Sequence, residues 1–126
     1  MTTLEVGKQL VSLCNKGQND KVYDTLYDPN IVSVEAADPP PGQAPGTMRE
    51  ARGIKDVKAK NTWWEAHHTV HSETVDGPYP HGDRFVVRFK FDVTDKDTNQ
   101  RQTFEETAIY TVANDKIIRE EFFYAT

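Results

Sequence analysis

The segment Lys116-Ile-Ile-Arg-Glu-Glu-Phe-Phe-Tyr124 decides the fold, because its side chains alternate in the way that a β-strand requires. The pair Asn114-Asp115 before it is typical of a tight hairpin turn. One face of this strand carries Ile118, Glu120, Phe122 and Tyr124, and the other carries Ile117, Arg119, Glu121 and Phe123. We expect the face with Glu120 to point into the protein and the face with Phe123 to point toward solvent or a partner.

Alternation of the same kind continues upstream and predicts an antiparallel meander of four strands. Residues 69–75 form its first strand, and we expect its turn at residues 77–82, which contain two prolines and two glycines. Residues 85–93 and 103–112 form the next two strands. Their inward faces carry Phe85, Val87, Phe89, Phe91 and Val93, and then Phe104, Glu106, Ala108, Tyr110 and Val112. One long apolar face of this kind has to be covered by other elements.

The first half of the chain supplies three helices that can cover this face. Thr2 and Glu5 have the spacing of a capping box, and Gly17 is a suitable C-terminal stop for the first helix. A second helix, capped by Asn19 or Asp20, carries an apolar stripe that ends at Tyr27. A third helix follows Gly53 and runs to the tryptophan pair at residues 63–64. A short β-branched strand at residues 31–35 lies between the second helix and the third.

Residues 37–46 contain four prolines and two glycines, which excludes a helix or an internal strand. We expect a long loop here, which serves either as a lid over a binding site or as a spacer. Long, strongly twisted strands curl, so the sheet and the three helices can enclose an interior. The sequence therefore predicts one α+β domain over residues 1–126.

The composition limits which binding partners and which cellular compartment we expect for this protein. A net charge of −5 argues against nucleic acid as a partner, and no apolar run is long enough to cross a membrane. Cys14 is the single cysteine, which fits a reducing, cytoplasmic environment. The chain has no Gly-rich phosphate-binding loop, so we expect no organic cofactor.

Several segments together resemble the SnoaL-like branch of the nuclear transport factor 2-like superfamily, which includes polyketide cyclases and ketosteroid isomerases. The resemblance is carried by residues 10–20, residues 26–35, the helix start Gly53-Ile-Lys-Asp-Val57 and the tail at residues 115–124. It implies a cystatin-like conical barrel, in which a curved mixed or antiparallel sheet of about five to six strands is covered by three helices. It also implies a mostly apolar cavity and a homodimer packed through the outer face of the sheet.

Glu35 is the first candidate catalytic residue, because the resemblance places it where ketosteroid isomerases have their aspartate base. The alternative is a strand-end carboxylate in water. Those isomerases also need two hydrogen-bond donors for an oxyanion. Here Leu10 occupies the first donor position, and the second falls near Thr107 or Ala108, with Glu106 close but not aligned. We therefore do not expect ketosteroid isomerisation.

Glu120 and His71 are the other catalytic candidates. Glu120 shares a face with aromatic residues and can act as acid or base if that face is buried, whereas the alternative is a salt bridge to Arg88 or Arg119. His71 can donate a hydrogen bond or shuttle a proton in the pocket. His67 and His71 have a spacing that suits zinc on a helix, but they straddle a helix-to-strand junction, so no metal is expected.

Five aromatic residues are candidates for binding a flat apolar ligand: Trp63, Phe89, Tyr110, Phe122 and Tyr124. Ordinary core packing uses the same residue types, so the alternative is a filled core. We expect acid–base chemistry on a small carbonyl or polycyclic compound. The competing hypotheses are a pocket that only binds an apolar metabolite and an assembly domain that dimerises through its outer sheet face.

Overall fold

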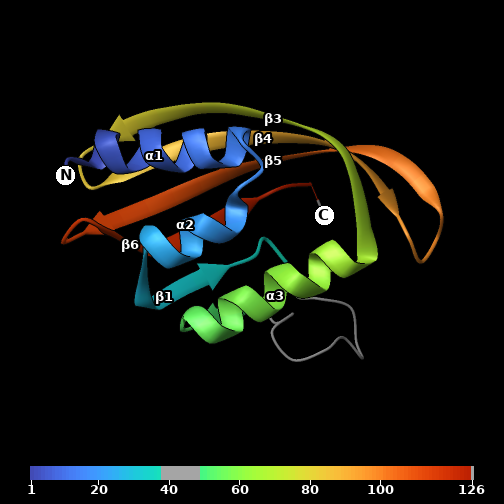
Figure 1. Ribbon diagram of the computed structural model, residues 1–126, viewed down its shortest axis with the longest axis horizontal. Coiled ribbons are helices and arrows are strands. Elements are labelled where there is room, and N and C mark those ends of the chain that lie inside the picture. Colours follow the sequence, from blue (N-terminus) through green and yellow to red (C-terminus); the bar gives the residue numbers. More distant parts are fainter. Residues whose placement is uncertain (38–48, 126) are drawn as a thin grey trace.

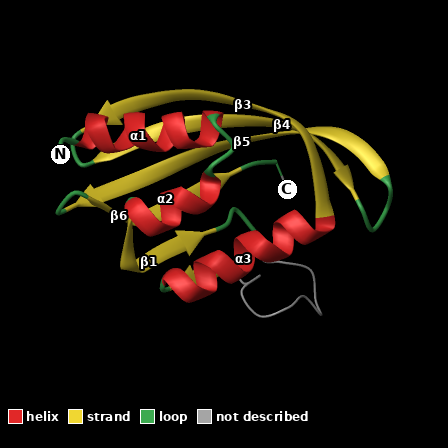
Figure 2. Cartoon of the chain, in the orientation of Figure 1, coloured by secondary structure: helices red, strands yellow, loops and turns green. Residues whose placement is uncertain are grey.

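The computed structural model describes residues 1–37 and 49–125, which form three helices and six strands (Figures 1 and 2). The helices are α1 (Thr3–Asn15), α2 (Asn19–Thr25) and α3 (Ile54–His67). The strands are β1 (Tyr27–Val34), β2 (Glu50–Arg52), β3 (His68–His81), β4 (Arg84–Asp95), β5 (Gln100–Ala113) and β6 (Lys116–Phe123). Most of the Pro-rich loop predicted at residues 37–46 lies outside the described residues.

The strands form one curved sheet in the order β2-β1-β6-β5-β4-β3. Every neighbouring pair is antiparallel except β1 and β6, which run parallel, so the sheet is mixed. The sheet does not close, because β2 and β3 lie at its two ends. In Figure 1 the long strands β3, β4 and β5 arch over the molecule, with β1 and β6 below them. The α+β class and the covering by three helices are confirmed.

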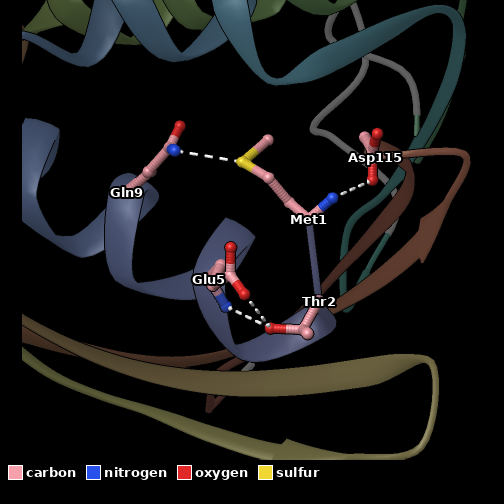
Figure 3. A network of polar contacts seen from close by, with 5 residues as sticks. All are labelled: Met1, Thr2, Glu5, Gln9 and Asp115. Atoms are coloured by element: carbon pink, nitrogen blue, oxygen red, sulfur yellow. Dashed lines mark hydrogen bonds and ion pairs between the residues drawn. The ribbon is translucent and has the colours of Figure 1, made fainter.

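Helix α1 is fixed at both of its ends, and Figure 3 shows the contacts at its N-terminal end. Thr2 Oγ1 accepts a hydrogen bond from the Glu5 backbone N–H at 3.1 Å, which confirms the capping box. The Met1 amino group donates to Asp115 in the β5–β6 turn, so the start of α1 is tied to the last hairpin. Gly17 ends α1 with a positive φ of 68°, a conformation that glycine adopts without strain.

The core lies where α1 and α2 pack against the inner face of the sheet. Phe85, Leu10 and Ile117 are almost fully buried there, and each such side chain contributes about 1.5–3 kcal/mol to stability. Gly7 lets α1 approach the sheet closely, since a Cβ at this position would lie 2.8 Å from Pro78 Cβ. The first helix therefore sits directly on β3 and β4.

The turn expected at residues 77–82 is wrong. Strand β3 continues to His81, and the turn is made by Gly82, with φ of 61°, and Asp83. Prolines are tolerated here because β3 is the edge strand, where an N–H is not needed on the outer side. A register shift between Asp76 and Tyr79 accommodates Gly77-Pro78 without ending the ladder.

Two smaller predictions at β1 and β6 are also wrong. Helix α2 ends at Thr25, and Tyr27 is the first residue of β1 rather than part of a helical stripe. In β6, Ile118 is partly exposed while Ile117 is buried, because a register shift pairs Val112 with Ile117 and Thr111 with Arg119. Ile118 is the extra residue of a bulge, and the alternation from Glu120 onward follows the prediction.

Candidate functional site

A cavity of about 520 Å³ lies between the three helices and the inner face of the sheet. Its wall includes all five predicted ligand-binding aromatics, namely Trp63, Phe89, Tyr110, Phe122 and Tyr124. Two of the three predicted catalytic residues, Glu35 and Glu120, line the same cavity. The described part of the core is therefore not completely filled by its aromatic side chains, and the space is comparable to ordinary small-molecule sites.

Glu120 is the most deeply buried carboxyl group of the site, with 3% of its surface exposed. Its Oε2 accepts a hydrogen bond from the Tyr27 hydroxyl, and its Oε1 accepts one from Ser33 Oγ at 2.7 Å. Burial raises the pKa of Glu120, whereas the Lys60 ammonium group and the two hydroxyl donors act in the opposite direction. The salt bridge to Arg119 considered from the sequence is not formed, because Arg119 contacts Glu121 instead.

Lys60 on α3 links Glu120 to Glu35. Its Nζ donates to Ser33 Oγ at 2.5 Å and lies 2.6 Å from Glu35 Oε1. The other oxygen of Glu35 accepts from the Tyr124 hydroxyl at 2.9 Å. A connected network thus runs from Tyr27 to Tyr124, and every oxygen of the two carboxyl groups in it has a donor.

Glu106 on β5 lies on the cavity wall beside Phe89, its pairing partner on β4, and differs from these carboxyl groups. Its side chain is half-buried, and no described residue gives its carboxyl group a hydrogen bond. The pKa of Glu106 is raised to about 8, chiefly by burial and also by the nearby Glu35 and Glu120, while Lys60 acts in the opposite direction. At neutral pH this carboxyl group is therefore mostly protonated and can donate a hydrogen bond into the cavity.

Cys14 and Glu73 also line the cavity, on the side of α1 and β3. Burial raises the pKa of the Cys14 thiol to about 12, which leaves almost no thiolate at neutral pH and argues against a cysteine nucleophile. Burial also raises the pKa of Glu73. These residues add polar atoms to a wall that is otherwise aromatic and aliphatic.

The expectation that His71 belongs to the pocket is wrong. His71 is exposed, and its Nε2 is 2.7 Å from Thr94 Oγ1 outside the cavity. A register shift between Val70 and Ser72 makes His71 the extra residue of a bulge, so it leaves the face that it would share with Glu73. Helix α3 ends at His67 and strand β3 begins at His68. His67 and His71 therefore lie in different elements and do not have the spacing of two residues on one helix. Within residues 1–37 and 49–125, no group of three potential metal ligands comes together.

Sequence reasoning did not select several polar members of the site, among them Glu106, Lys60, Tyr27 and Ser33. Glu106 could have been found, because it is the only charged residue on the inward face of its strand, between Phe104 and Ala108. Lys60 lies one helical turn from Val57, on the side of α3 that faces the sheet. Tyr27 and Ser33 gave no signal, because their partner Glu120 is distant in sequence.

The outer face of the sheet carries Phe123, with 48% of its surface exposed. A homodimer through this face stays a prediction. Among the described residues, no helix has both the length and the apolar character needed to cross a membrane.

The order of elements and the curved mixed sheet together define an α+β protein of the cystatin-like, nuclear transport factor 2-like class. The family model for the SnoaL-like domain matches residues 1–124. The chain belongs to the SnoaL-like family.

Solved structures of similar proteins agree with this assignment. A candidate SnoaL-like polyketide cyclase from Mesorhizobium loti is 39% identical, with a TM-score of 0.90 over 98% of this chain and 100% of that chain. A candidate isomerase from Bacillus subtilis is 14% identical, with a TM-score of 0.76 over 99% of this chain and 90% of that chain. TerC, co-crystallised with polyporic acid, is 15% identical, with a TM-score of 0.70 over 98% and 91%. None of the curated proteins compared with this chain matches it.

Proposed function

We propose that this protein is a cofactor-independent enzyme that moves a proton next to the carbonyl group of a small, largely apolar compound. The observation that carries the proposal is the place of Glu106 on the wall of an aromatic cavity that Glu35 also lines, without a hydrogen-bond partner among the described residues and with a pKa raised chiefly by burial. A neutral carboxylic acid in an apolar site is a strong donor to an oxygen that gains negative charge. The similarity to candidate cyclases and isomerases supports the same class of chemistry.

Glu35 and Glu106 have complementary roles in this reaction. Glu35 takes the proton from the carbon atom beside the carbonyl group, so that a C–H bond breaks and an O–H bond forms on the carboxylate. Glu106 hydrogen-bonds to the carbonyl oxygen and gives it a proton as the enol forms. Glu35 then gives its proton to another carbon atom of the enol while the enol O–H group returns its proton to Glu106, so both residues are restored and the isomerisation needs no further reactant.

Glu120 acts as a positioning residue in this scheme. Both of its oxygens are occupied by Tyr27 and Ser33, and Ser33 in turn accepts a hydrogen bond from Lys60. Glu120 therefore fixes the hydroxyl group that holds the Lys60 ammonium group beside Glu35. Trp63, Phe89, Tyr110 and Phe122 supply the apolar walls that hold the ring system of the substrate.

The proposal is tested with 2-tetralone, a bicyclic ketone, by following deuterium incorporation beside its carbonyl group in D₂O by NMR. We expect the wild-type protein to accelerate this exchange and Glu106→Gln and Glu35→Gln each to lose about 100-fold or more. Glu105→Gln is the matched control, because Glu105 is the neighbouring residue on β5 and its side chain is 59% exposed. An exchange rate that is unchanged in both cavity variants, or absent in the wild type, would contradict proton transfer by these residues.

A further inference from the structure

Lys60 lines the cavity but gives no proton to the substrate in the reaction described above. Its side chain is only 13% exposed, and its Nζ lies 2.6 Å from Glu35 Oε1 and 2.5 Å from Ser33 Oγ. A buried ion pair adds little to the stability of a fold as a rule, because the loss of hydration offsets the attraction between the charges. The place of Lys60 beside the proposed base therefore points to chemistry.

The Lys60 ammonium group keeps one N–H for a ligand. An ammonium group has three N–H donors, and among the described residues Glu35 and Ser33 accept two of them. Ser33 donates its own proton to Glu120 Oε1 at 2.7 Å, so it offers only lone pairs to Lys60. The Nζ atom also lies 5.1 Å from the centre of the Phe122 ring, which is part of the cavity wall. The remaining N–H therefore lies next to the space for the substrate.

The short distance between Lys60 and Glu35 suits two neighbouring atoms of one substrate. Their Nζ and Oε1 atoms are 2.6 Å apart on the same wall of the cavity. Glu35 can therefore face a hydrogen atom on the carbon beside a carbonyl group while Lys60 faces an oxygen atom on the next carbon. Both groups then act on the same face of the substrate, which is the geometry of a syn elimination.

We propose that this protein also dehydrates β-hydroxy ketones, and that Lys60 is the acid that protonates the departing hydroxyl group. The inference rests on the roles of Glu35 and Glu106 in the function proposed above. It names the substrate class of that site more closely: a ketone with a hydroxyl group on the second carbon from the carbonyl and an apolar body that lies along the aromatic wall.

The reaction balances without a further reactant. Glu35 takes a proton from the carbon beside the carbonyl group, and Glu106 gives a proton to the carbonyl oxygen as the enol forms. When the enol returns this proton to Glu106, its electrons form the new C=C bond and the C–O bond to the hydroxyl group breaks. The departing oxygen takes a proton from Lys60 Nζ and leaves as water. Glu35 then passes its proton to the neutral Lys60 amine beside it, so all three residues are restored.

The test uses 4-hydroxy-4-phenylbutan-2-one in D₂O, followed by NMR. Enone formation and deuterium incorporation at the CH₂ group beside the carbonyl are measured in the same sample, and their ratio reports the elimination step separately from enolisation. We expect Lys60→Met and Lys60→Arg each to lower this ratio about 100-fold or more, because methionine has no proton to give and a guanidinium group does not release one. Lys90→Met, which removes an exposed ammonium group, is the control and should keep the ratio of the wild type.

Lys60→Arg separates proton donation from a positive charge beside Glu35. A ratio that is unchanged in Lys60→Arg would mean that Lys60 supplies only its charge, and a ratio that is unchanged in Lys60→Met would mean that Lys60 is not needed. Either result would overturn the proposal.

A second measurement needs no variant. The two diastereomers of the substrate with one deuterium atom on the same CH₂ carbon are treated with the wild type in H₂O, and the first enone formed is analysed by mass spectrometry. We expect deuterium to be lost from the diastereomer in which it eclipses the hydroxyl group in the conformation that leads to the trans enone, and to be kept in the other. The opposite pattern would overturn the proposal.

The two proposals fail separately. If no enone forms but 2-tetralone exchanges its protons in a Glu106-dependent manner, dehydration is wrong and the proton-transfer function stands. If the enone forms in a Lys60-dependent manner but 2-tetralone does not exchange, dehydration stands and the isomerisation of simple ketones is wrong. Absence of both reactions overturns both proposals.

Discussion

The carboxyl groups on the two sides of the cavity differ in whether other protein groups hydrogen-bond to them. On the side of β1, β6 and α3, both oxygens of Glu35 and both oxygens of Glu120 accept hydrogen bonds or an ion pair. On the side of β3 and β5, neither Glu73 Oε1 nor the carboxyl group of Glu106 has a hydrogen-bond partner within the described part of the chain. On the first side, protein partners hold Glu35 and Glu120 in place, whereas on the second side the described residues leave hydrogen-bonding capacity for a ligand.

This difference shows that burial alone does not identify a ligand-binding carboxyl group. Glu120 is the more deeply buried residue, yet its hydrogen-bonding capacity is already used by Tyr27 and Ser33. A larger fraction of Glu106 than of Glu120 is exposed, and Glu106 lines the cavity. A buried acid with an unused donor is the one that can act on a substrate.

The largest expected contrast is in stability. Glu120→Gln places an amide N–H group against one of two hydroxyl donors, and we expect a loss of about 2 kcal/mol in the free energy of unfolding. Glu106→Gln breaks no described hydrogen bond, and we expect a change within about 0.5 kcal/mol at about pH 4, where this carboxyl group is largely protonated in both the folded and the unfolded state. Urea unfolding of both variants checks the contrast. Equal destabilisation by the two substitutions would remove the distinction between the two sides.

The second contrast concerns the dependence of stability on pH. The folded-state pKa of Glu106, about 8, lies above the ordinary value of 4.5, so the folded protein binds this proton more tightly than the unfolded chain. The tighter proton binding stabilises the folded state. This contribution to the free energy of unfolding is fully present below pH 4.5 and is lost as the pH rises through 8. We expect it to be on the order of 2 kcal/mol, because water in the cavity reduces the effect.

Urea unfolding at a series of pH values between 5 and about 9 measures this contribution, since other groups also titrate there. We expect the stability of the wild type to fall across this range relative to Glu106→Gln, and the stability of Glu105→Gln to follow that of the wild type. Parallel curves for the wild type and Glu106→Gln would mean that this carboxyl group titrates normally.

The smallest expected effect links the two sides. Lys60 lowers the pKa of both Glu120 and Glu106. Replacement of Lys60 by methionine should therefore raise the pKa of Glu106 by about half a unit, since the charge acts over several ångströms. Lys90→Met, which removes an exposed ammonium group near Glu105, is the control and should leave this pKa unchanged. The pH midpoint of 2-tetralone exchange reports the shift.

The sequence was a good guide to the strands, because the alternation of Phe85 to Val93 and of Phe104 to Val112 directly reflects burial on one face. It failed where a strand departs from strict alternation. Bulges at His71 and Ile118 turn a side chain to the other face, and nothing in the local sequence marks the position of either bulge.

The site was only half predictable for a related reason. Glu120 and the five aromatics were predicted from their positions in the strands and helices, and Glu35 was predicted from the resemblance to the SnoaL-like family. The roles of Glu120 and Glu106 depend on which partners reach them, and Tyr27 and Ser33 are 93 and 87 residues away from Glu120 in the sequence. Only the folded chain shows that one of these acids has its donors and the other does not.

Direct titration of the Glu106 carboxyl group tests the central claim. The protein is prepared with ¹³C-labelled glutamate side chains, its carboxyl signals are followed by NMR from pH 3 to about 10, and Glu106→Gln identifies the signal. We predict that Glu106 titrates with a pKa of about 8. A pKa for Glu106 near its ordinary value of 4.5 would contradict the account, because the carboxyl group would then be ionised at neutral pH and unable to donate a proton.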